Sequence, residues 1–230
     1  MPEPLRKRWF VLCGLLVLAF NLRPAAGSIG PVLAEIKAGL GMSGTEAGLL
    51  TSLPVLAFAA FGAMAPAAAA RFGVHRVTLV SLTLLVVGVA ARSTVHSPGA
   101  FLALSLVALS GMAAANVLLP SLIKLHFADR IGLLTALYTT TLALGQTLAI
   151  TLTVPLADLL GGWRAGLGCW AGLGLIAAVP WLRLIGHDRH LAGGPHEIGL
   201  LQVARTRLGM AMALAFGLQS LQAYVMFGWF

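Results

Sequence analysis

The sequence is poor in charged, cysteine and aromatic residues. Only 10% of its 230 residues are charged, against roughly a quarter in soluble domains. Its two cysteines, Cys13 and Cys169, fall within apolar runs, and no CxxC motif or Cys/His cluster suggests a metal or redox site. We interpret both cysteines as packing residues, and we expect neither a cofactor nor a bound metal.

Catalytic patterns are absent as well. The apolar runs contain no Ser/His/Asp set, no HExxH motif and no paired carboxylates where a membrane enzyme would need them, so we expect no enzymatic activity. Four carboxylates flank the runs, and all lie near run ends: Glu35, Glu46, Asp129 and Asp158. The carboxylate of a simple intramembrane proton relay is therefore missing from this stretch of chain.

Long hydrophobic runs dominate what is present. Hydrophobic residues make up 59% of the chain and the mean hydropathy is +0.93, as in a polytopic membrane protein. A spanning helix needs about 20 mainly apolar residues. Runs of this kind cover 9–32, 44–70, 77–91, 101–125, 131–156 and 163–184. We predict an all-α membrane bundle over 1–184, a cytoplasmic loop over 185–207, and the start of a seventh spanning helix over 208–230.

The net charge of +8 raises the question of nucleic acid. The basic residues lie in short loops between apolar runs, without the basic face that tracks a phosphate backbone, so no nucleic-acid partner is expected. With the N-terminus in the cytoplasm, most Lys and Arg residues fall on the cytoplasmic side, and only Lys37, Arg92 and Arg164 fall outside. At the end of the fourth run, Lys124 and His126 are interpreted as residues that reach toward lipid headgroups.

Two local patterns mark the ends of runs. The tetrapeptide SGTE, from Ser43 to Glu46, is a capping box that predicts a helix start. The loop after the sixth run contains His187, His190 and His196. A metal site is one reading of these histidines, but Gly and Pro residues between them break any regular ligand spacing, so a solvated linker is favoured.

One arginine lies in the middle of the first run, within AFNLRPAAGSIGP. A charged side chain there is costly in a membrane and marks a functional site by default. Arg23 is therefore predicted to bind an anion in a water-filled cavity, since a guanidinium offers five donors in a fixed fork. The alternative is a structural arginine that binds backbone carbonyls freed by Pro24 or Pro31.

The first and fourth runs share a pattern in which Asn precedes a helix-breaking Pro, as NLRP and NVLLP. Runs one to three and four to six would insert with opposite orientation, which is the inverted-repeat arrangement of many transporters. Asn21 and Asn116 lie at comparable depth. Each is a candidate to bind substrate or to hydrogen-bond another helix.

The fifth and sixth runs carry further polar or small residues. Tyr138 and Gln146 are candidates to line an aqueous path, whereas most threonines of the fifth run are expected to bond the carbonyl one turn earlier. In the sixth run, two glycine pairs predict close helix packing: Gly162/Gly166 and Gly168/Gly172.

Together these segments resemble the major facilitator superfamily, and more closely its cyanate and 2-nitroimidazole permease family (CynX/NimT). The resemblance covers almost the whole chain in the right order. The general superfamily motif after the second run is degenerate, because ARFGVHR has Ala70 where an Asp is usual. The segments that carry the likeness are NLRPAAGSIGPVLAEI, TEAGLLTSLPVLAF, NVLLPSLIKLHF, LYTTTLALGQTLA and GLQSLQAYVMFGWF.

The resemblance implies two six-helix bundles that move by alternating access in a bacterial-type inner membrane. It implies a small polar or anionic solute, with proton coupling as the usual arrangement. Gln219 and Tyr224 match family positions that face the cavity. Because such proteins have about twelve spans, we expect this chain to be an N-terminal half that lacks the C-terminal bundle and does not transport alone. Drug or nitroimidazole efflux and a non-transporting half-transporter module are the alternatives.

Overall fold

The described part of the chain is helical. The computed structural model describes residues 5–184 and 206–229, and every regular element in those ranges is a helix. Helices α1 to α9 belong to one unit and α11 to a second. The elements are α1 (Leu5–Leu22), α2 (Pro24–Gly27), η1 (Gly30–Val32), α3 (Leu33–Leu40), α4 (Gly44–Ala57), η2 (Phe58–Gly62), α5 (Ala63–Phe72), α6 (Val74–Arg92), α7 (Pro98–His126), α8 (Ile131–Leu160), α9 (Trp163–Leu184) and α11 (Arg207–Trp229).

Six stretches among the described residues are long and apolar enough to cross a membrane, and their order matches the six predicted runs. The first differs most from its prediction, because it continues through α3 to Leu40. The third extends at both ends to include the polar residues His75 and Arg92, both fully buried. The stretches are Trp9–Leu40, Gly44–Phe72, Val74–Arg92, Pro98–His126, Ile131–Leu160 and Trp163–Leu184.

The first span is interrupted where the sequence places its prolines. Helix α1 ends at Leu22, Pro24 opens the four-residue α2, and Pro31 lies in the 3-10 turn η1 before α3 begins. Proline has no backbone N–H, so Pro24 cannot donate to the Phe20 carbonyl, and Pro31 cannot donate to that of Gly27. The break that NLRP predicts in the first span is therefore observed at Pro24.

The second span begins at the predicted capping box. The Glu46 backbone N–H donates to Ser43 Oγ at 3.2 Å, and the Ser43 N–H donates to Glu46 Oε2 at 2.8 Å. The two bonds satisfy donors that a helix start otherwise leaves open, and a cap of this kind contributes about 1 kcal/mol.

Further along, the second span changes its winding. The π-helical turn η2 lies between Pro54 and Pro66, each of which removes a backbone donor from the helix. Such turns often mark functional sites. Here η2 packs on α7, and Gly62 faces Val117 next to Asn116.

Helices α6 and α7 pack closely through glycines. A Cβ added to Gly88 would lie 2.5 Å from the Ala108 backbone nitrogen, and one added to Gly111 would collide with the Ser81 carbonyl oxygen. These contacts fix the antiparallel register of the two helices, with residue 88 opposite residue 108. The backbones approach so closely because no side chain separates them.

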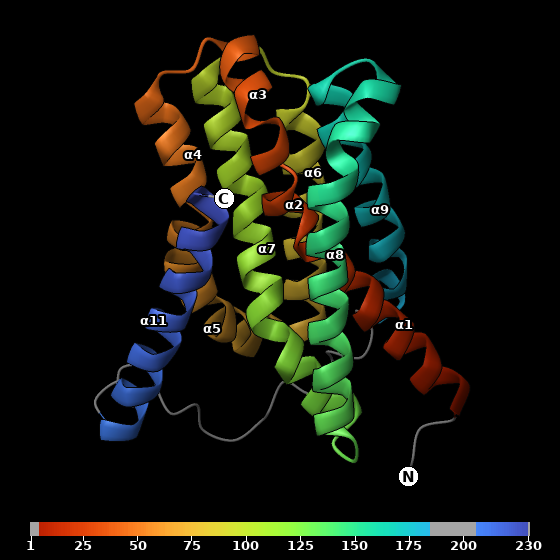
Figure 1. Ribbon diagram of the computed structural model, residues 1–230. Helices are drawn as coiled ribbons and strands as arrows, with labels where there is room; N and C mark the ends of the chain where they lie inside the picture. Colours follow the sequence, from red (N-terminus) through yellow and green to blue (C-terminus); the bar gives the residue numbers. More distant parts are fainter. Residues whose placement is uncertain (1–4, 185–205, 230) are drawn as a thin grey trace. The chain divides into compact units, whose positions relative to one another are not determined.

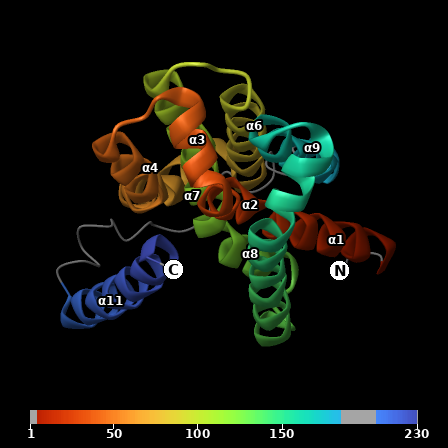
Figure 2. The same ribbon diagram turned by 45° about the horizontal axis from the view of Figure 1, so that its top comes forward.

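The helix contacts follow the pattern of an inverted repeat. The first span, through α1, packs against α8 and α9, and the fourth span, α7, packs in the same way against α4 and α6. Figure 1 shows α7 and α8 at the centre of this unit between α4 and α9, and Figure 2 shows α6 next to α9. A two-fold relation between spans one to three and four to six produces this pairing. The predicted membrane-type helix bundle is confirmed.

The glycines of the sixth span that pack against a neighbour differ from those predicted. Gly166 packs against Ala157 of α8 as expected, and Gly168 lies against Ser93, the residue that follows α6. Gly162 instead lies in the turn before α9 with φ of 130°, and Gly172 has nothing within 4 Å of an added Cβ. Gly174 packs against α6 although the sequence pattern did not select it. The pairing fails because i,i+4 spacing shows which residues share a face but not which face meets a neighbour.

Helix α11 occupies the position of the predicted seventh span. Only the last two positions of the predicted loop at 185–207 belong to the described residues. His187, His190 and His196 lie outside them.

The α6–α7 contact yields a stability prediction. Substitution of Gly111 by Ala places a methyl group against the Ser81 carbonyl, so we expect the free energy of unfolding to fall by about 1–3 kcal/mol, as for other overpacked sites. Thermal unfolding of the purified chain in detergent measures this effect. The matched control is Gly172→Ala, which adds its methyl group to open space. Equal midpoints for the two variants would contradict the close packing of α6 and α7.

Candidate functional site

The interruption in the first span lies against two long helices that carry predicted site residues. Segment α2 contacts both α7 and α8. Helix α7 carries Asn116, and α8 carries Tyr138 and Gln146. The fold therefore brings the broken helix together with polar side chains from the fourth and fifth spans.

A glycine of α8 accommodates the carbonyl that Pro24 leaves without its helical donor. The Phe20 carbonyl oxygen occupies the space that a Cβ of Gly145 would fill. Any larger residue at position 145 would push α8 away from the end of α1. Gly145 therefore allows the close contact at which the broken helix and the fifth span meet.

The next residue of α8 reaches the other end of the break. A Cβ added to Gly27 would lie 2.6 Å from Gln146 Nε2, so the Gln146 amide lies directly against the Gly27 backbone. Arg23 comes between Phe20 and Gly27 in sequence, and these two residues contact consecutive positions of α8. Arg23 and Gln146 thus belong to the same junction.

The Arg23 side chain is partly exposed. Among the described residues it has no hydrogen bond, ion pair or ring contact. Its backbone carbonyl accepts from the N–H groups of Ala26 and Gly27, at 3.2 and 2.9 Å, and so starts α2. The structural alternative, in which the guanidinium binds carbonyls freed by the prolines, finds no such bond here. The guanidinium is left with its donors available.

The two predicted asparagines have different environments. Asn21 is 3% exposed, and its Nδ2 donates to the Val17 carbonyl at 2.8 Å, one turn earlier in the same helix. Asn116 is partly exposed on α7, without a hydrogen bond among the described residues. Asn116 is therefore partly accessible at the bundle surface, whereas Asn21 is buried inside the bundle.

The polar side chains of the fifth span are of two kinds, threonines that bond the helix backbone and side chains that do not. Thr139, Thr140, Thr141, Thr151 and Thr153 each donate to the carbonyl four residues earlier, at 2.5 to 2.9 Å, as predicted. Tyr138 is partly buried against the core and makes no hydrogen bond within the described residues. Tyr138 and Gln146 therefore stay candidates to line an aqueous path, and Thr135 and Thr147 are further polar groups of α8 that are not buried.

Two predicted residues lie in the second unit. Gln219 is exposed on α11. Tyr224 falls within α11, but its side chain is outside the described ones. The arrangement of this unit relative to the first is not defined, so their roles stay predictions.

One arginine was missed. Its place at the end of an apolar run predicts that Arg92 lies among the outer charges, but its side chain is fully buried in the bundle. Its Nη2 reaches Ser28 Oγ at 3.5 Å, next to the broken segment, while Nε and Nη1 have no partner. The sequence signal was weak, because an arginine at the end of an apolar run is equally typical of a loop. Only the α6–α7 register reveals its burial.

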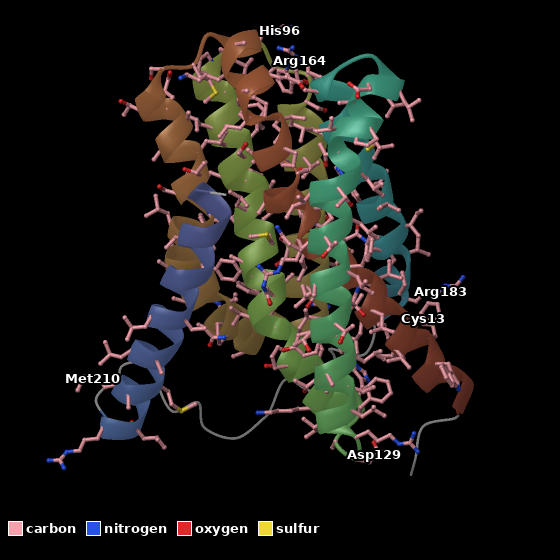
Figure 3. All side chains as sticks on the ribbon, viewed as in Figure 1. Cys13, His96, Asp129, Arg164, Arg183 and Met210 are labelled. Carbon is pink, nitrogen blue, oxygen red and sulfur yellow. The ribbon has the colours of Figure 1, made fainter. Side chains whose placement is uncertain are left out.

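Arg164, at the start of α9, is partly buried as well. Its Nη2 donates to the Val95 carbonyl at 3.3 Å, and its guanidinium lies 4.2 Å from the centre of the Trp163 ring. Figure 3 shows Arg164 close to His96 at one end of the unit and Asp129 at the other. Arg164 thus ties the start of α9 to the loop between α6 and α7.

A histidine pair joins two helices at the opposite end. His75 is fully buried at the start of α6, and its Nε2 lies 2.9 Å from Nε2 of His126 at the end of α7. Lys124 is exposed as predicted, but the headgroup interpretation of His126 is wrong, because its ring bonds inward. No group of three or more metal-binding side chains gathers within the described ranges.

Known proteins resemble this chain in sequence and in fold. The sequence model of the Major Facilitator Superfamily matches residues 9–230. A solved structure of the peptide transporter POT in complex with sulfate superimposes with a TM-score of 0.68 at 19% identity, over 95% of this chain and 47% of that one. At this identity the likeness concerns the fold alone.

Three curated proteins are similar in sequence. The uncharacterized transporter YycB of Bacillus subtilis is 36% identical, over 100% of this chain and 58% of that protein. The 2-nitroimidazole transporter of Escherichia coli is 32% identical, over 97% and 57%. The cyanate transport protein CynX of Escherichia coli is 28% identical, over 74% and 44%. The chain thus spans about half the length of the curated relatives it matches.

The partial exposure of Arg23 predicts how cysteine would react there. In a background where Cys13 and Cys169 are replaced by Ala, we expect Arg23→Cys to react with a charged, membrane-impermeant thiol reagent in nanodiscs. Leu22→Cys is the buried control, and Leu152→Cys, 41% exposed on the bundle's apolar surface, is the lipid-facing control.

Mass spectrometry reads the extent of modification. Modification at position 23 with neither control modified would mean that this side of the broken helix contacts water. Modification at position 152 but not at position 23 would contradict an aqueous environment for Arg23.

Proposed function

Because this chain belongs to the Major Facilitator Superfamily, we propose that it forms one bundle of a secondary active transporter for a small anionic or polar solute. It is a multi-pass membrane protein of the transporter type with six apolar helices. The proposed location is a bacterial-type inner membrane, with the N-terminus in the cytoplasm because Lys and Arg concentrate on that side.

One observation carries the proposal, namely the placement of Arg23. A guanidinium at a helix interruption within an apolar span is partly exposed and has no protein partner among the described residues. Two opposite unit charges 4 Å apart attract by about 4 kcal/mol at the effective dielectric of a protein surface. An anion that reaches the break would therefore be held by Arg23, with Gln146 and Asn116 to hydrogen-bond its uncharged parts.

The broken helix would also allow the first span to bend during transport. Segments α2 and η1 are short, and their prolines remove helical hydrogen bonds, so this part of the first span bends more easily than a continuous helix. In alternating access, one bundle rocks against another around a central site. We propose that the break lets the first span adjust as the solute enters and leaves.

The names of two relatives indicate candidate solutes. A 2-nitroimidazole and cyanate are both small, and cyanate is an anion, so a guanidinium anchor suits the second directly. The higher identity to the 2-nitroimidazole transporter favours a second candidate, efflux of a small neutral heteroaromatic compound. In that case Tyr138 and the amides, rather than Arg23, would dominate recognition.

The other wall of the site is expected from a second bundle. Gln219 and Tyr224 on α11 are proposed to contribute from that side. A coupled proton is part of the proposal, but none of the described carboxylates is buried, so its carrier would lie elsewhere in the transporter.

Uptake by the full-length gene product in proteoliposomes tests this function. A panel of labelled small anions that includes cyanate is compared for the unmodified protein, Arg23→Lys and Arg23→Ala. A hydrogen bond to a charged group contributes about 1.5–3 kcal/mol, so we expect KM to rise by roughly tenfold or more in both variants.

The control is Arg130→Lys, since Arg130 is an exposed arginine at a helix start that pairs with its neighbour Asp129. Unchanged anion uptake in both Arg23 variants would refute the anion anchor. Loss of 2-nitroimidazole efflux in Tyr138→Leu, with Arg23→Ala active, would support the second candidate instead. A separate assay of the 230-residue chain tests the expectation that it does not transport alone.

A further inference from the structure

Arg92 is the charged side chain that the proposed transport site does not use. It is the last residue of α6, and no part of its side chain is exposed. Among residues 5–184 and 206–229, its one hydrogen bond is a long one, 3.5 Å from Nη2 to Ser28 Oγ, and Nε and Nη1 are buried without a partner there. Two of its three nitrogens therefore point into the bundle with nothing to bind.

Such a group is costly unless a negative charge compensates it. Arginine stays protonated in proteins, so Arg92 cannot become neutral as a buried lysine can. An ion buried without a partner destabilises the folded state by several kcal/mol. The bundle must therefore supply a counter-charge or take one from solution.

The described carboxylates do not supply it. Glu46 binds Ser43, and Asp129 lies 3.7 Å from Arg130. Glu35 and Asp158 are exposed on the surface, whereas Arg92 is fully buried. Throughout the described ranges, no ion pair to Arg92 is found.

A second unpartnered group faces Arg92 across the helix pair. Gly88 opposes Ala108, and Arg92 lies one turn beyond Gly88 on the same face of α6. Ser105 lies one turn before Ala108 on the matching face of α7. The antiparallel register therefore sets Arg92 and Ser105 at the same level on facing sides.

The Ser105 hydroxyl is unusual among those of the spans. Ser81 donates to Val77 and Ser110 donates to Val107, each at 2.7 Å within its own helix. Ser105 is fully buried, yet its Oγ has no hydrogen-bond partner. Its proton is thus available to a ligand between α6 and α7.

We propose that a small monovalent anion of the halide class binds the buried Arg92 guanidinium between α2, α6 and α7. Arg92 Nε and Nη1 and the Ser105 hydroxyl donate to it, and its single charge compensates that of Arg92. Full burial excludes large or multiply charged anions, which would bring more charge than one guanidinium balances. Ser28 links this site to the broken segment.

This site differs from the proposed solute anchor. Arg23 is partly exposed, whereas Ser28, which Arg92 contacts, is fully buried five residues later. Side chains five residues apart on a helix point in directions about 140° apart. The two arginines therefore approach the break from different sides. A halide at Arg92 would stabilise the bundle whether or not Arg23 binds solute.

The experiment uses the purified 230-residue chain in detergent at constant ionic strength. Chloride replaces gluconate stepwise, and the thermal unfolding midpoint is followed by tryptophan fluorescence. We expect the midpoint to rise and saturate with chloride, because a ligand of the folded state alone stabilises it. Broadening of the chloride NMR signal by the protein provides a direct reading of binding.

Three variants separate this site from general salt effects. We expect Arg92→Gln to lose both the midpoint rise and the broadening, and Ser105→Ala to need a higher chloride concentration for the same rise. Arg130→Gln removes an equal charge from an exposed arginine outside both proposed anion sites, and should respond as the unmodified chain does. If Arg92→Gln fails to fold, the comparison of Ser105→Ala with Arg130→Gln still tests the proposal.

An unmodified chain insensitive to chloride, or an equal response in Arg92→Gln or Ser105→Ala, would overturn the proposal. Loss of the response in Arg23→Gln alone would also overturn it, because the halide would then bind at the solute anchor.

Discussion

The bundle depends on one constraint, that backbone polar groups inside a membrane must be satisfied within the protein. Pro24 and Pro31 break that rule twice in the first span. The Phe20 carbonyl loses its helical donor and lies against Gly145, where no side chain keeps α8 away. This close approach brings Gln146 onto Gly27 and leaves the turn that contains Arg23 at the junction. A continuous first helix would have no such turn.

The two sides of that break are chemically different. On one side Arg23 is partly exposed beside polar groups of α7 and α8. On the other side Ser28 is buried, and both its hydroxyl and its backbone N–H donate to the Pro24 carbonyl, at 2.6 and 3.2 Å, which holds the end of α2 in place. Ser28 also accepts from Arg92. The interruption is therefore supported from inside the bundle while its outer side stays available for function.

Much of this architecture could be predicted from the sequence, because its signals are local. Apolar length identified the six spans, the proline pair located the break, and Ser43 with Glu46 marked a helix start. The burial of Arg92, the uncommitted Ser105 and the His75–His126 bond could not be predicted. Each depends on the register of α6 against α7, which glycine contacts fix and which no local pattern encodes. Likewise, the solute-facing role of Arg23 stays a prediction.

The same register explains why α6 can carry a buried arginine at all. Gly88 and Gly111 bring α6 and α7 into backbone contact, which leaves little space for a large side chain between the helices at those levels. By the same register, positions 92 and 105 come level with each other one turn beyond Gly88. At this end of α6, the Arg92 Nη2 group reaches Ser28 Oγ. A change in the charge balance at Arg92 would therefore act on this end of α6 and, through Ser28, on the broken helix.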